Sequence, residues 1–313
     1  MRASVLVLAA ACGSTPEIAG SVDAPPADSV AVDAAVPVDA RTCGQRSGMR
    51  GLTTRTVTAG GLTRRFHAYL PERDAGTPMP LVFVHHGFTM SGQAMVDITR
   101  YRALAEREGI AVAFPDGQGG ASSLEPPWNV GSGTCSSTSG PPPVAAGDDF
   151  AMLDAIEAEL ANDQCIDGDR IYVTGFSMGG YFSNHAACMY DRIRGAAPHS
   201  GGSHDLSACV GGPVPVIVLH GTGDALIPAS CGRQSAERWA AHNGCGTTTT
   251  SRSIDGGTCI RYDGCPAGGQ VEYCTFTAMG HCWAGGVLGS IYACPTYAQA
   301  TELTWEFWKT YAD

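Results

Sequence analysis

One serine lies where the sequence predicts a strand, a tight turn and a helix in immediate succession. Residues 171–180 read IYVTGFSMGG, in which an apolar, β-branched run predicts a buried strand and a helical pattern begins near Gly180. Ser177 is at the centre of a G-x-S-x-G pattern, whose glycines let the strand and the helix approach closely. Such a turn projects the hydroxyl above a sheet edge, where it can act as a nucleophile. The alternative, a glycine-rich loop with a solvated serine, does not explain the flanking strand and helix.

A serine hydroxyl is a poor nucleophile at neutral pH, so Ser177 needs a base, and the base needs an acid that orients it. After a serine in such a turn, the acid comes next along the chain and the histidine follows. The strand predicted at 214–220 opens into HGTGDALIP, which places Asp224 at a carboxyl end, on the same edge as Ser177. His281, in MGHCWAGG, has a flanking glycine and is the last histidine. We predict the triad Ser177, Asp224 and His281, with Asp205, Asp255 or Asp263 as alternative acids.

Two backbone N–H groups are predicted to form an oxyanion hole beside the serine. The N–H of Met178 lies at the first turn of the predicted helix, where the helix dipole favours negative charge. The second donor should come from the loop after the strand predicted at 81–85, which reads HHGFTMSG. Phe88 is our first choice for this donor. Thr89 is the alternative donor and a candidate substrate-binding residue.

Tryptophans near these loops are candidates for the wall of a substrate pocket. Trp128 and Asn129 lie in PPWNVGSGTC, and Trp283 follows His281 by two residues. Alternatively, Trp128 only covers a loop and Trp283 packs under the histidine loop. Cys282 is predicted to form a disulfide that stiffens this loop rather than to provide a catalytic thiol.

Charge and cysteine content narrow the class of protein. The chain has 313 residues and a net charge of -11, with Lys309 as its only lysine, which argues against nucleic acid or an anionic membrane as the main partner. Thirteen cysteines without any C-x-x-C pair indicate an oxidising compartment. A metal site is the alternative, but irregular spacing disfavours it for Cys245, Cys259, Cys265 and Cys274. His85 and His86 are adjacent on a predicted strand and therefore face opposite sides.

The N-terminus predicts export. Residues 1–12 form a short basic and apolar leader that ends in a lipobox-like AAAC, with Cys12 as the lipidation site and ordinary cleavage as the alternative. The apolar run is too short to span a bilayer. Residues 13–41 are rich in Ala, Pro, Val, Asp and Ser without apolar periodicity, which predicts a disordered linker.

Predicted strands alternate with predicted helices from about residue 42 to residue 313, which indicates one α/β domain with a mostly parallel sheet. The glycines at 60 and 61 predict a hairpin at the sheet edge. The expected strands are 53–59, 63–70, 81–85, 110–114, 171–174, 195–198 and 214–220. Five helices are expected, at 95–108, from Asp148 or Asp149 as the cap to 161, from about 180 to 189, at 234–243 and at 297–311. Residues 244–282 contain five cysteines and predict disulfide-held hairpins.

Five segments in this order resemble a known esterase group: LVFVHHG, WNVGSG, IYVTGFSMGGY, HGTGD and GHCWAGG. The group holds poly(3-hydroxybutyrate) depolymerases and the feruloyl esterases of carbohydrate esterase family one, and the resemblance covers residues 42–313. The cysteine-rich stretch is similar to feruloyl esterases of the fungal B, C and D types. The resemblance implies an α/β-hydrolase fold, the triad roles for Ser177, Asp224 and His281, no cofactor and no metal.

A feruloyl esterase that releases hydroxycinnamates from plant cell-wall polysaccharide is the function that this resemblance implies first. Phe88 and Ala284 stand where depolymerases of the group commonly have Cys and Pro, which places a polyhydroxybutyrate depolymerase second, together with an acetyl xylan esterase. A non-catalytic glycan-binding surface lipoprotein is the alternative from another class. We expect a monomer that is extracellular, on the cell surface or periplasmic, whose contact with a membrane is limited to an N-terminal lipid.

Overall fold

The computed structural model describes residues 46, 48–73 and 77–312 of the chain. The predicted leader with Cys12 and the predicted linker at 13–41 lie outside these residues. No helix within the described ranges is long and apolar enough to cross a bilayer.

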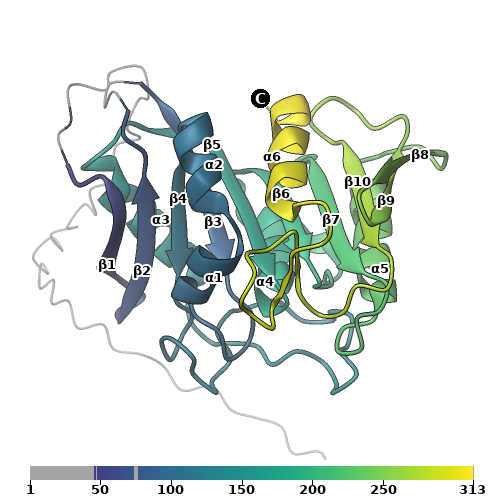
Figure 1. Ribbon diagram of the computed structural model, residues 1–313, viewed down its shortest axis with the longest axis horizontal. Helices are drawn as coiled ribbons and strands as arrows, with labels where there is room; N and C mark the ends of the chain where they lie inside the picture. The colour runs from purple at the N-terminus through teal and green to yellow at the C-terminus, as the bar shows by residue number, and fades with distance from the viewer. Residues whose placement is uncertain (1–45, 47, 74–76, 313) are drawn as a thin grey trace, which may run out of the picture. The chain divides into compact units, whose positions relative to one another are not determined.

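The strands of the described chain form one large sheet with a parallel centre (Figure 1). In spatial order they are β1 (Gly51–Ala59), β2 (Leu62–Leu70), β4 (Ala111–Pro115), β3 (Met79–His85), β5 (Ile166–Phe176), β6 (Ile193–His199), β7 (Val216–Gly221), β10 (Val271–Phe276), β9 (Gly257–Tyr262) and β8 (Thr249–Ile254). Neighbouring strands from β4 to β10 pair in parallel, and an antiparallel hairpin forms each edge. The predicted parallel sheet with β1 and β2 as an edge hairpin is confirmed.

Helices cover both faces of this sheet, three on each in the described residues (Figure 1). One face carries α1 (Gly92–Ile98), α2 (Tyr101–Glu108) and α6 (Ala300–Tyr311), and the other carries α3 (Asp149–Ala161), α4 (Met178–Met189) and α5 (Ala229–His242). Each group of helices packs on its own apolar core, because the central strands are buried on both faces. This layered arrangement is the α/β-hydrolase fold that the sequence predicts.

The helix predicted over 95–108 is in fact two helices. Arg100 adopts a φ of 63°, which ends α1 and turns the chain before α2 begins. The Thr99 hydroxyl donates to the Met95 carbonyl oxygen at 2.6 Å, and Arg100 Nε donates to the Gly285 carbonyl oxygen at 2.9 Å. A left-handed φ is unfavourable for a residue other than glycine, and the contact with a distant loop offsets it. The prediction was wrong here because the break depends on a partner 185 residues away.

Two aspartates at the start of α3 have different roles. Asp148 caps the helix by accepting the Ala151 N–H at 2.9 Å, as predicted. Asp149 is buried, and its Oδ1 accepts from Arg64 at 2.9 Å across to the edge hairpin. Asp149 therefore ties the helix to β2 rather than capping it.

The cysteine-rich segment forms the second edge of the sheet. Two disulfides, Cys245–Cys265 and Cys259–Cys274, hold β8, β9 and β10 together, so the alternative of a metal site at these four cysteines is excluded. The other disulfides between described residues are Cys135–Cys231, Cys188–Cys209 and Cys282–Cys294. The predicted hairpins are confirmed, and β10 in addition joins the parallel centre through β7.

Candidate active site

The serine turn has the strand–turn–helix geometry that the sequence predicts. Ser177 lies between β5 and α4 with φ 58° and ψ -119°, a conformation that few non-glycine residues adopt. Its N–H donates to the His199 carbonyl oxygen at 2.9 Å. A Cβ added at Gly179 would lie 2.1 Å from the His85 carbonyl oxygen, and one added at Gly175 would lie 2.4 Å from the Gly179 carbonyl oxygen. Glycine at both positions is therefore required for this turn to form.

Asp224 and His281 are brought together from two different strand ends. Asp224 follows β7 and His281 follows β10, and these strands are parallel neighbours. His281 Nδ1 lies 2.7 Å from Asp224 Oδ2. Since an ionised carboxylate only accepts hydrogen bonds, Nδ1 carries the proton and Nε2 is left as the basic nitrogen. This tautomer is the one that can remove a proton from a hydroxyl.

Asp224 is held as a carboxylate by several donors. Burial alone would raise its pKa, but hydrogen bonds from His220 and His281 and from the Ile227 N–H outweigh burial and hold the pKa of Asp224 well below its usual range. Asp224 Oδ1 accepts the N–H groups of Leu226 and Ile227 at 3.0 and 2.9 Å. His220, which no sequence motif marks, lies with Nε2 3.5 Å from Asp224 Oδ2 and 2.9 Å from the Ile227 carbonyl oxygen.

The three alternative acids make other contacts. Asp205 caps the 3-10 helix Leu206–Ala208 by accepting the Ser207 N–H at 3.0 Å. Asp263 accepts from the Thr250 hydroxyl at 2.9 Å on the edge hairpin. The carbonyl oxygen of Asp255 accepts the Ala298 N–H at 3.0 Å. Asp224 is therefore the aspartate that the structure pairs with His281.

The imidazole of His281 lies beside the serine turn. Its ring packs against the ring of Phe176, the residue directly before Ser177, with centroids 4.7 Å apart. Ser177, Asp224 and His281 follow the carboxyl ends of β5, β7 and β10, which run in the same direction. The histidine, the carboxylate and the serine thus share one edge of the sheet, as the sequence predicts.

The loop after β3 also packs against Ser177. A Cβ added at Gly87 would lie 3.1 Å from the Ser177 Cβ, so the following residues, Phe88 and Thr89, begin next to the serine. Both are exposed, and Thr89 has a φ of 62°. Met178 is the first residue of α4 on the other side of Ser177.

His86 holds this loop through both ring nitrogens. The Gly117 N–H donates to Nε2 at 2.9 Å, so the proton is on Nδ1, which donates to the Gly87 carbonyl oxygen at 2.7 Å. Trp128 Nε1 donates to the His86 carbonyl oxygen at 2.8 Å. The imidazole therefore acts as a support for the loop.

The prediction that Trp128 and Trp283 form a pocket wall is wrong. Trp128 is 0% exposed and stacks on Phe182, and Trp283 is 1% exposed and stacks on His199. Each indole is part of the packing beneath a loop, which is how a large apolar side chain contributes most to stability.

The predicted disulfide of Cys282 is confirmed. Cys282 bonds to Cys294 and closes the loop that follows His281. Inside this closure, β11 (Trp283–Ala284) pairs with β12 (Ala293–Cys294). The base is therefore next to a rigid crosslink.

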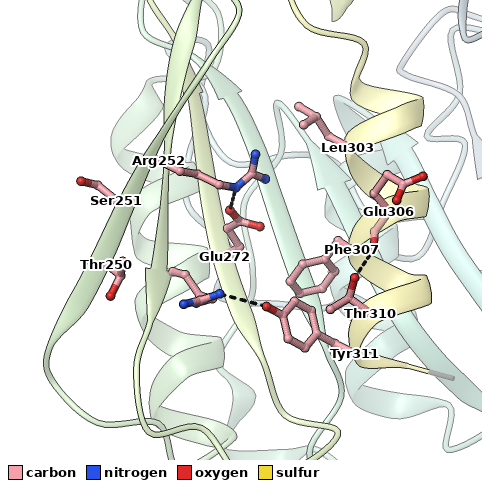
Figure 2. A pocket seen from close by; sticks show the side chains of 10 residues that line it. Thr250, Ser251, Arg252, Glu272, Leu303, Glu306, Phe307, Thr310 and Tyr311 are labelled. Atoms are coloured by element: carbon pink, nitrogen blue, oxygen red, sulfur yellow. Dashed lines mark hydrogen bonds and ion pairs between the residues drawn. The ribbon is translucent and has the colours of Figure 1, made fainter.

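A cleft of about 410 Å³ between α6 and the edge hairpin β8–β9 lies apart from these residues. Figure 2 shows Arg252 directed at Glu272, at 2.7 Å, and the Arg261 guanidinium reaches the Tyr311 hydroxyl at 3.0 Å. Both arginines of the cleft are thus paired with other residues that line it, and we assign no role to the cleft.

Comparison with known proteins shows that the chain is similar to several esterases. Residues 64–205 match the family model described as Esterase PHB depolymerase. Feruloyl esterase B of Piromyces equi is 29% identical over 234 residues, which cover 67% of this chain and 41% of that protein. Feruloyl esterase D of Neurospora crassa is 28% identical over 261 residues, 78% of this chain and 82% of that protein. Among solved structures, an acetyl xylan esterase from Aspergillus awamori has a TM-score of 0.57 at 17% identity and covers 73% of this chain and 94% of its own.

The solved structure supports the fold alone, whereas the sequence matches extend to the serine turn and to the loop after β3. The family match includes Ser177, Gly87 and Phe88. The chain is therefore similar to feruloyl esterases and, over residues 64–205, to the Esterase PHB depolymerase family, and it has the α/β-hydrolase fold.

Proposed function

We propose that this protein is a serine carboxylic ester hydrolase that works through Ser177, His281 and Asp224. The observation that carries the proposal is the 2.7 Å bond from His281 to Asp224, made by an imidazole that packs on the residue before Ser177. The pair prepares a neutral base beside a serine with a strained backbone. The match of residues 64–205 to an esterase family model supports the same chemistry.

Each group has a defined step in the proposed reaction. His281 Nε2 takes the proton of Ser177 Oγ as the oxygen attacks the ester carbonyl carbon, and Asp224 stabilises the imidazolium that forms. The negative oxygen of the tetrahedral intermediate accepts the N–H groups of Phe88 and Met178, with Thr89 as the alternative donor. His281 then protonates the leaving alcohol. A water molecule, deprotonated by His281, hydrolyses the acyl-enzyme and regenerates Ser177.

The proposed substrate is a hydroxycinnamate ester of plant cell-wall polysaccharide. The names of the similar proteins, feruloyl esterases B and D, support this choice. A bifunctional acetylxylan esterase/xylanase of Neocallimastix patriciarum, 30% identical over 168 residues, supports acetylated xylan as the second candidate. The name of the matching family model supports a polyhydroxybutyrate substrate as the third.

We also propose that the enzyme works outside the cytoplasm, as an extracellular, surface or periplasmic monomer with a lipid on Cys12. Five disulfides between described residues support an oxidising compartment, because such crosslinks are rare in reducing ones. Mass spectrometry of the mature protein would detect the lipid, and an unmodified N-terminus after cleavage would favour release.

The decisive experiment compares the wild-type protein with Ser177→Ala. A fluorophosphonate probe should label Ser177 in the wild type, and S177A should lose label and lower kcat by about 10⁶-fold while it remains folded. Methyl ferulate, a 3-hydroxybutyrate oligomer and acetylated xylan are assayed side by side to rank the substrates. A folded wild type that takes no label, hydrolyses no ester and still binds glycan would favour the non-catalytic alternative.

A further inference from the structure

His199 lies at the end of β6, between the serine turn and the histidine loop. Its carbonyl oxygen accepts the Ser177 N–H at 2.9 Å, and its ring nitrogen Nε2 accepts the Ala284 N–H at 3.1 Å. Ala284 follows His281 by three residues, inside the loop closed by the Cys282–Cys294 disulfide. One residue therefore bonds to the segment that carries the nucleophile and to the segment that carries the base.

The hydrogen bonds determine the tautomer of this imidazole. A backbone N–H can only donate, so Nε2 of His199 has no proton, and the proton is on Nδ1. Nδ1 lies 3.1 Å from the Ser200 hydroxyl oxygen, which accepts it. The ring is completely buried, and burial, followed by the nearby His220 and His281, holds the pKa of His199 well below its ordinary value. His199 is thus a neutral, oriented acceptor.

Aromatic packing places the ring independently of its hydrogen bonds. Trp283 stacks on the imidazole with centroids 4.8 Å apart, and Phe276 lies parallel at 6.2 Å. Phe176 packs edge-on against His199 at 5.8 Å and in a tilted arrangement against His281 at 4.7 Å. A phenylalanine at position 199 would keep this shape and remove the Nε2 acceptor together with the Nδ1–H that donates to Ser200, so the contribution of packing can be separated from that of the hydrogen bonds.

We infer that His199 is a positioning residue for the base: its bond to Ala284 fixes the histidine loop to the strand that also anchors Ser177, and so sets the distance between imidazole and hydroxyl. This inference depends on the proposed function. The disulfide and the β11–β12 pairing keep the loop folded. Both of these contacts are internal to the loop. The His199 bond connects the folded loop to β6 and so positions it relative to Ser177.

The test compares His199→Phe with His199→Gln in hydrolysis of p-nitrophenyl acetate. H199F should lower kcat by about 10- to 100-fold with KM within about twofold, because displacement of a base by about 1 Å has an effect of this size. H199Q supplies an amide oxygen as acceptor and should recover most of the loss. His67→Phe is the control, since His67 is another buried histidine with a ring hydrogen bond, to the Thr54 hydroxyl on the edge hairpin. H67F should retain the wild-type kcat.

A second variant removes the same bond from its donor side. Ala284→Pro deletes the N–H, and if both variants act through one bond, the loss of kcat in the double variant H199F/A284P should be smaller than the product of the single losses. This variant also keeps the inference testable if H199F does not fold. The inference would be overturned if folded H199F or A284P had the wild-type kcat, or if H199Q were as impaired as H199F. In either case an active, labelled wild-type protein would still support the proposed function. A wild type without activity or label would overturn both.

Discussion

The proposed nucleophile, Ser177, and its proposed base, His281, are held in place by different means. Ser177 is placed by backbone sterics, because its turn forms only if positions 175 and 179 lack a Cβ and can approach the His85 carbonyl oxygen at the end of β3. His281 is placed by side-chain contacts between distant segments: Asp224 lies 57 residues away, and the loop after His281 is closed by a disulfide. The comparison teaches that one half of the site depends on two glycines close together in the sequence, and the other half on side chains that are far apart in the sequence. Substitutions in the two halves should therefore fail in different ways.

After Ser177→Ala, the largest effect is expected from Asp224→Asn. An amide at 224 can donate to His281 Nδ1, which moves the imidazole proton to Nε2 and removes the base. We expect kcat to fall about 10⁴-fold with the fold intact, measured by ester hydrolysis and circular dichroism. The controls are D205N and D263N at the alternative acids, which should stay close to wild type. Equal losses in D224N and D263N would contradict the assigned acid.

In the serine turn, Gly179→Ala should act on folding as well as on activity. The added Cβ would lie 2.1 Å from the His85 carbonyl oxygen. This oxygen belongs to the backbone, so a side-chain rotation cannot relieve the clash. We expect a loss of about 3 kcal/mol in the free energy of unfolding, measured by urea denaturation, together with loss of labelling at Ser177. Gly212→Ala is the control, because no described atom lies within 4 Å of its added Cβ. A stable, fully active G179A would show that the turn still forms when position 179 and the His85 carbonyl oxygen lie further apart.

In the histidine loop, the double variant C282S/C294S should lower activity without abolishing it. Opening this crosslink is expected to reduce the free energy of unfolding by about 2 kcal/mol, because the unfolded chain regains freedom. The control is C188S/C209S, which removes a crosslink of α4 instead. The kcat at a temperature where both variants are folded should fall further in C282S/C294S. The same kcat in both variants would mean that the crosslink does not place the base.

The smallest expected effect is a loss of stability under mild acid. Burial lowers the pKa of His85 to about 3 and of His86 to about 4, below the ordinary value of 6.5. The unfolded chain takes up protons below about pH 6.5 while the folded chain does not, so stability is full above that pH and falls as pH decreases towards about 4. Urea midpoints at pH 7.5, 6 and 5 measure the decline. His85→Phe should make it shallower, and an unchanged slope would mean that His85 does not contribute.

Much of the fold and of the candidate site could be predicted from sequence because the signals are local. The β-branched run and glycines around Ser177 predict β5, the turn and α4, and Asp148 predicts the start of α3. The position of Asp224 and His281 after strands places them on the same edge, since parallel strands end together. Trp128 and Trp283 were misjudged because residue type does not tell whether a side chain points into a pocket or under a loop.

The sequence by itself determined the order of strands and helices, the serine turn and the residues that can act as acid and base, because these depend on local periodicity, backbone sterics and chain order. Only the tertiary structure decided the disulfide pairs, the break at Arg100 and the bond from His199 to Ala284. The reason is that each of these depends on the distance between residues far apart in the chain. That distance is set by how the sheet and its helices pack, and no pattern of neighbouring residues records it.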